Sequence, residues 1–112
     1  MNDYKEMLSE MKDMLPKLGA ANPDAMKGFQ QLKEAIERDG ALPKKMKVLI
    51  ALATAITQQC DWCIVVHVKD ALAAGATKEE ILETGWVAVM MGGGPALMYF
   101  QGVQKALDDL GA

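Results

Sequence analysis

The fold class depends most on the sequence PKKMKVLIALA, residues Pro43 to Ala53. Lysines at its start give way to residues that are apolar on nearly every side of a helix, as in an element enclosed on several sides. A central parallel strand is the alternative for such a run. The alanines, the length and the lack of β-rich neighbours favour a helix. We therefore expect a deeply buried helix that opens at Pro43, in an all-α fold.

Glycine, proline and capping residues divide the rest of the chain into helices. Asn22 followed by Pro23 is typical of an N-cap and a first helical position, and Thr77 with Glu80 forms a capping-box pattern. The glycine-proline turn at residues 92–95 should end one helix and allow another to begin. About six helices are therefore predicted, over residues 4–18, 23–39, from 43 onward, from about 60 to 74, 77–91 and 96–110.

The composition is that of one small domain. Of the 112 residues, 51% are hydrophobic and only 5% aromatic, so aliphatic side chains and methionine must build the core. We assign residues 1–112 to a single domain, with N-terminal helices in 1–40 and a motif-bearing core in 42–99. The high apolar content of so short a chain also predicts a homo-oligomer.

Charge and hydropathy argue against several classes of partner. The net charge is −3 and the basic residues are scattered, so no nucleic-acid partner is expected. The longest apolar stretch, residues 86–100, is shorter than the ~20 residues that span a bilayer and contains glycines, so no membrane partner is expected. The first six residues contain no apolar signal-peptide core, which favours a cytoplasmic location.

The chemistry of the chain is concentrated in Cys60-Asp61-Trp62-Cys63 and in His67, four residues further on. Both cysteines and the only histidine lie within these eight positions. At about 100° per residue, the two thiols and the imidazole share one face of a helix. Near a helix start the cysteines can close a reversible disulfide, and His67 can move the proton that thiol chemistry requires. The pattern predicts peroxide reduction or thiol–disulfide exchange.

Two other interpretations of the same residues stay open. Two cysteines and one histidine are usual zinc ligands, and an Asp or Glu would have to supply the fourth. Alternatively, the thiols fill a helical core as small apolar groups, with His67 a buried imidazole that has found a hydrogen-bond partner. A non-catalytic redox sensor or a metal clip that sets the oligomeric state would fit these interpretations.

From Leu42 to Tyr99 the chain resembles the carboxymuconolactone decarboxylase and alkylhydroperoxidase D-like family. The stretches that carry the resemblance are residues 47–53, 60–67, 71–81 and 91–96, in the family's order. The resemblance implies an all-helical fold that assembles into trimers or hexamers. It also implies hydroperoxide reduction by the cysteine pair, with Cys63 activated through His67 and Cys60 as its disulfide partner.

The resemblance further implies that electrons come from a thiol or dithiol donor protein, with no bound cofactor or metal. The decarboxylase branch generally lacks the cysteine pair, so decarboxylase-like activity on a small organic acid is the weaker alternative. Peroxidase members usually carry a relay glutamate twelve residues before the first cysteine, where this chain has Val48. Glu83, or else Glu80, is the candidate replacement, although both also fit a solvated helix face.

Overall fold

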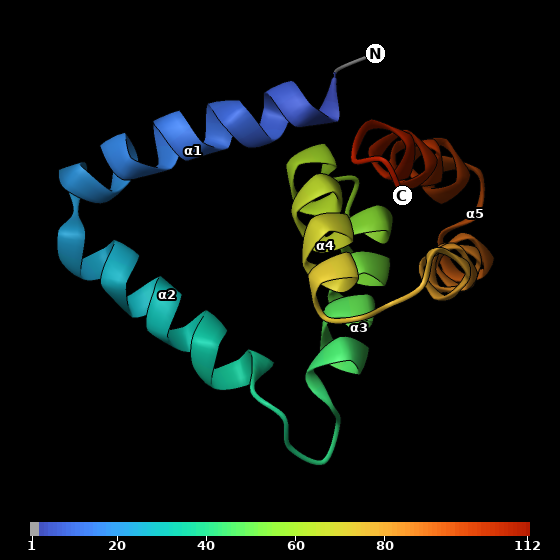
Figure 1. The fold of residues 1–112 in the computed structure, drawn as a ribbon, viewed down its shortest axis with the longest axis horizontal. Helices are drawn as coiled ribbons and strands as arrows, with labels where there is room; N and C mark the ends of the chain where they lie inside the picture. Colours follow the sequence, from blue (N-terminus) through green and yellow to red (C-terminus); the bar gives the residue numbers. More distant parts are fainter. Residues whose placement is uncertain (1–2) are drawn as a thin grey trace.

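The computed structural model describes residues 3–112, and every regular element within them is an α-helix (Figure 1). The all-α prediction is confirmed. The last two predicted helices form one kinked element, which is why five helices stand where about six were expected. None of the helices in residues 3–112 is long and apolar enough to cross a membrane. The helices are α1 (Tyr4–Ala21), α2 (Pro23–Glu37), α3 (Lys44–Thr57), α4 (Asp61–Ala73) and α5 (Lys78–Asp109).

The body of the molecule consists of α3, α4 and α5, which pack against one another. The predicted burial of α3 is confirmed for one side of the helix, where Val48, Leu52 and Ile56 are almost completely excluded from solvent. It is wrong for the other side, because Ile50 is 50% exposed and Met46 is exposed as well. Within residues 3–112, the side of α3 that carries Met46 and Ile50 is therefore left open to solvent.

The kink in α5 brings the two halves of that helix together. Gly93 has a φ of 69°, a left-handed conformation that suits glycine, and Pro95 follows where a new helical segment begins. The rings of Trp86 and Phe100, one from each half, meet edge to face with centroids 5.2 Å apart. The turn predicted at residues 92–95 is therefore present, and it lets one long element cover two sides of the core.

The two N-terminal helices extend away from this body, and only the start of α1 is buried in it. Figure 1 shows α1 and α2 meeting at an angle on one side of the molecule. The predicted cap is confirmed, since the Ala25 N–H donates to Asn22 Oδ1 at 3.1 Å, while α1 continues past Gly19 to Ala21. No side chain of α2 is buried, and its apolar residues Phe29 and Ile36 are 65% and 56% exposed. Within residues 3–112, this apolar stripe of α2 thus has no cover.

Candidate redox site

Cys60 and Cys63 are joined in a disulfide at the N-terminus of α4. Cys60 is the N-cap residue, with an extended backbone, and Cys63 lies in the first turn. The Cα atoms are 5.2 Å apart, within the range that a disulfide requires. The Cys63 N–H also donates to Cys60 Sγ at 3.2 Å. The predicted position of the motif at a helix start is therefore confirmed, with Cys60 in the capping role that serine or aspartate more often takes.

The turn at the C-terminal end of α3 leads directly to Cys60. The Cys60 N–H donates to the Ala55 carbonyl at 3.1 Å, and the Gln59 N–H donates to the Ile56 carbonyl at 3.2 Å. These two bonds form the Schellman motif that ends many helices. Gln59 occupies the left-handed position with a φ of 58°, which usually belongs to glycine. The turn leaves no linker between the core helix and Cys60, so the disulfide is rigidly attached to the core.

His67 lies one turn beyond Cys63 and is half-buried. Its Nδ1 is 2.7 Å from the Cys63 carbonyl oxygen. Because a backbone carbonyl can only accept a hydrogen bond, Nδ1 carries the proton of the neutral ring and Nε2 keeps its lone pair. The histidine is thus bound to the backbone of one redox cysteine, with its second nitrogen left to accept a proton.

The carboxylates predicted as relay groups lie elsewhere on the protomer. Glu80 closes the capping box with Thr77 and pairs with Lys45, with Nζ to Oε2 at 3.0 Å. These contacts hold the pKa of Glu80 below its usual range, the hydrogen bond from Thr77 being the larger cause. Lys45 is at the start of α3, whereas the cysteines follow the C-terminal end of that helix. At ~1.5 Å per residue, the two ends are roughly 18 Å apart. Glu83 is exposed on the groove between α3 and α5.

Val48, at the position expected for the relay glutamate, is 1% exposed and packs in the core. Within residues 3–112, His67 forms no ion pair with a carboxylate. The described part of the chain also holds no cluster of three or more His, Cys, Asp or Glu side chains arranged to bind a metal ion. Within residues 3–112, no Asp or Glu thus joins Cys60, Cys63 and His67 as a fourth zinc ligand.

Two residues near the cysteines were missed in the sequence. Asp61 lies between the cysteines, and its carboxylate faces the hydroxyl of Tyr4, the first residue of α1. Burial, and then the charge of Asp61 and a hydrogen bond to it, raise the pKa of Tyr4 to about 12. The sequence could have pointed to Asp61, because a carboxylate between the two cysteines of a CxxC motif lies close to both of them. Tyr4 carried no such signal, because it is far from Asp61 in the sequence.

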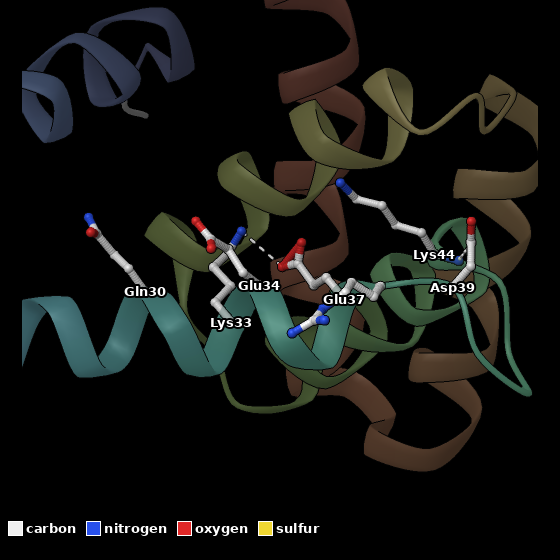
Figure 2. A pocket seen from close by; sticks show the side chains of 7 residues that line it. Gln30, Lys33, Glu34, Glu37, Asp39 and Lys44 are labelled. Atoms are coloured by element: carbon white, nitrogen blue, oxygen red, sulfur yellow. Dashed lines mark hydrogen bonds and ion pairs between the residues drawn. The ribbon is translucent and has the colours of Figure 1, made fainter.

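A polar cavity of about 820 Å³ lies between α2 and the start of α3, and neither cysteine lines it. Figure 2 shows that its lining side chains are mainly charged. Lys33 binds Glu37 at 2.9 Å and Asp70 at 3.5 Å, and the Lys44 N–H donates to Asp39 at 2.7 Å. Of these contacts, Lys33–Asp70 joins α2 to α4, so we interpret the cavity as a solvated junction between helices.

A helical protein with a disulfide at the N-terminus of a core helix and a histidine one turn later defines a class of redox-capable proteins. The chain belongs to the carboxymuconolactone decarboxylase family, whose sequence pattern matches residues 23–106. The family expected from the motif is thereby confirmed. Tyr4 and the rest of α1 lie outside the matched region.

Relatives of nearly the same length share this fold. An uncharacterized protein of Cupriavidus necator is 39% identical over 110 residues, covering 98% of this chain and 97% of its own length. The apo form of a carboxymuconolactone decarboxylase family protein from Legionella pneumophila is 38% identical with a TM-score of 0.93, and the match covers 100% of both chains. A family member from Thermotoga maritima, described as a candidate for the antioxidative response, is 27% identical with a TM-score of 0.81, over 94% of this chain and 89% of that one.

Proposed function

We propose that the protein is a thiol-dependent oxidoreductase whose Cys60–Cys63 pair cycles between disulfide and dithiol while it reduces hydroperoxides or disulfides. The observation that carries this proposal is the disulfide at the N-cap of α4, with the Cys63 N–H donating to Cys60 Sγ. In the reduced protein the same N–H and the positive end of the helix stabilise a thiolate at Cys60. The description of the Thermotoga maritima relative agrees with an antioxidant role.

In the peroxide reaction, the Cys63 thiolate attacks the distal oxygen of R–OOH and the O–O bond breaks. The sulfur becomes a sulfenic acid, and the alkoxide leaves as ROH once it receives a proton. Cys60 then attacks the sulfenic sulfur as the thiolate that the helix N-terminus stabilises; the S–S bond forms, the S–O bond breaks, and hydroxide leaves as water with the proton that Cys60 released. A dithiol donor protein reduces the disulfide by exchange and is itself oxidised, so that two electrons pass from donor to peroxide in each cycle.

His67 is the proton carrier in this scheme. Its Nε2 takes the proton of the Cys63 thiol and returns it to the leaving oxygen, while Nδ1 remains bound to the Cys63 carbonyl. Glu83 remains the candidate for a relay carboxylate, since Glu80 is engaged by Thr77 and Lys45. With Val48 at the usual relay position, we expect disulfide chemistry to be the stronger activity and peroxide reduction the weaker.

We also propose that the protein acts as a homo-oligomer, a trimer or a hexamer, in the cytoplasm. The uncovered apolar stripe of α2 and the exposed Met46 and Ile50 of α3 support assembly with further copies of the chain. A reducing compartment would supply the thiol donor that the cycle requires. Light scattering on the purified protein measures the assembly directly, and a monomer at micromolar concentration would contradict this part of the proposal.

The test is consumption of cumene hydroperoxide with dithiothreitol as electron donor. Cys63→Ser should abolish thiol-dependent turnover, and His67→Asn should lower the rate by roughly 10²-fold or more, because asparagine can still donate to the Cys63 carbonyl but cannot carry a proton. A variant with both cysteines replaced is the control for background reaction with the reductant. If that variant consumes peroxide and exchanges disulfides as fast as the wild type, the proposed function is wrong.

A further inference from the structure

The first turn of α1 is anchored beside the redox site. Tyr4 is 4% exposed, and its hydroxyl lies against the carboxylate of Asp61, the residue that directly follows Cys60. A cavity of about 210 Å³ opens beside the pair, lined also by Tyr99 and Gly102. Neither Tyr4 nor Asp61 has a part in the proton and electron transfers described above, yet the buried Tyr4 hydroxyl holds the half-buried Asp61 carboxylate in the segment that carries the disulfide.

Gly102 makes this approach possible. A Cβ atom at residue 102 would overlap the Tyr4 hydroxyl and would lie 3.8 Å from Asp61 Oδ1. The hydroxyl therefore rests directly on the backbone of α5, and the Asp61 carboxylate lies close to the same glycine. Because Gly102 is itself buried, this packing is enclosed by three helices, α1, α4 and α5.

The backbone of Tyr4 is held as firmly as its side chain. Its N–H donates to Asp109 Oδ2 at 3.0 Å, and the other carboxylate oxygen of Asp109 binds Lys105 Nζ at 3.0 Å. The Asp3 side chain caps α1 by accepting from the Lys5 N–H at 2.8 Å. With both its backbone and its ring fixed, the Tyr4 hydroxyl is a rigid partner for Asp61.

We propose that Asp61 sets the redox equilibrium of the Cys60–Cys63 pair through its charge, and that Tyr4 is a positioning residue that holds the Asp61 carboxylate beside Cys60. This inference rests on the proposed function in requiring that the pair be redox-active. The Cα atoms of Asp61 and Cys60 are ~3.8 Å apart as chain neighbours. The carboxylate is thus well within the ~10 Å over which charges interact at ordinary ionic strength.

The sign of the effect follows from the charges of the two redox states. Reduction by a thiol pair breaks the Cys60–Cys63 bond, delivers two electrons and converts the reductant to its disulfide, and it leaves Cys60 partly as a thiolate at the helix N-terminus. The disulfide carries no charge. A fixed carboxylate next to Cys60 therefore disfavours the reduced state and makes the pair a weaker oxidant.

The test is the equilibrium constant for reduction of the full-length protein in glutathione redox buffers at pH 7, measured by trapping free thiols. Asp61→Asn should raise this constant roughly tenfold, which corresponds to about 30 mV. Tyr4→Phe keeps the ring and its packing and frees the carboxylate to turn toward solvent. It should raise the constant roughly threefold, and it should add nothing in the Asp61→Asn background. Tyr99→Phe, in the same cavity, is the matched control and should stay within twofold of the wild type.

Each outcome of this experiment is decisive for one proposal or the other. If the wild type titrates as a redox couple but Asp61→Asn stays within twofold of it, the inference about Asp61 is wrong and the proposed function is untouched. An equal effect of Tyr4→Phe with and without Asp61 would refute the positioning role of Tyr4. If the wild-type cysteines do not titrate at all, the proposed function fails, and the inference fails with it.

Discussion

Cys60 contributes to stability in two separable ways, as a disulfide partner and as the N-cap of α4. The disulfide joins residues three positions apart, so it closes a loop of about four residues, for which chain entropy gives about 2 kcal/mol of stabilisation. An N-cap hydrogen bond contributes about 1 kcal/mol more. Cys60→Ala should therefore lower the free energy of unfolding by about 3 kcal/mol. Cys60→Ser, whose hydroxyl can still cap the helix, should lower it by about 2 kcal/mol.

Urea unfolding followed by helical circular dichroism measures these differences. The oxidised wild type, the wild type in excess reductant and the two variants should be compared at one protein concentration, because assembly shifts apparent stability. The reduced wild type is expected to lie near Cys60→Ser. Equal unfolding free energies for the serine and alanine variants would show that Cys60 does not cap α4, and unchanged stability on reduction would refute the loop-entropy reasoning.

Three further predictions concern the turn before Cys60 and the anchor of α1. Gln59→Gly should raise the free energy of unfolding by roughly 0.5–1 kcal/mol in urea unfolding, since glycine adopts the positive φ without strain; a loss of stability would contradict this. In a Tyr99→Phe variant, the phenolate absorbance of Tyr4 should titrate near pH 12. Because the pKa of Tyr4 is raised, the stability that Tyr4 gives the folded protein is complete below pH 10 and is lost as the pH rises toward 12. Lys105 and the Tyr4 N–H lower the pKa of Asp109. The stability that Asp109 gives the folded protein is therefore present above the ordinary carboxyl pKa, and it is lost as the pH falls through the lowered pKa of Asp109. Asp109→Asn should therefore flatten the acid side of the stability profile, and an unchanged profile would count against this contact.

The helices could be predicted largely because their ends are encoded locally. Asn22 and Thr77 cap the helices that follow them, as expected, since a capping bond involves residues only three apart. The turn at residues 92–95 was predicted because glycine and proline also act on the backbone locally. The exposure of α2 was not predictable, because an apolar stripe does not say whether its cover comes from the same chain or from another.

The redox pair could be predicted because Cys60 and Cys63 meet through the geometry of a single helical turn. The ion pair that engages Glu80 could not be predicted, because its partner Lys45 lies on a different helix, at the end far from the cysteines. The contact between Tyr4 and Asp61 likewise joins residues that are distant in sequence. No local pattern encodes such a pair.

The sequence by itself determined the family, the helical class and the disulfide, all of which depend on spacings of a few residues. Only the tertiary structure decided what surrounds the sulfurs. It buries Val48 where a relay acid was expected, and it brings the Tyr4 hydroxyl against Gly102 of α5 and the carboxylate of Asp61. The physical reason is that electrostatic and hydrogen-bond environments are set by distances between helices, which packing of the whole core fixes and local sequence does not.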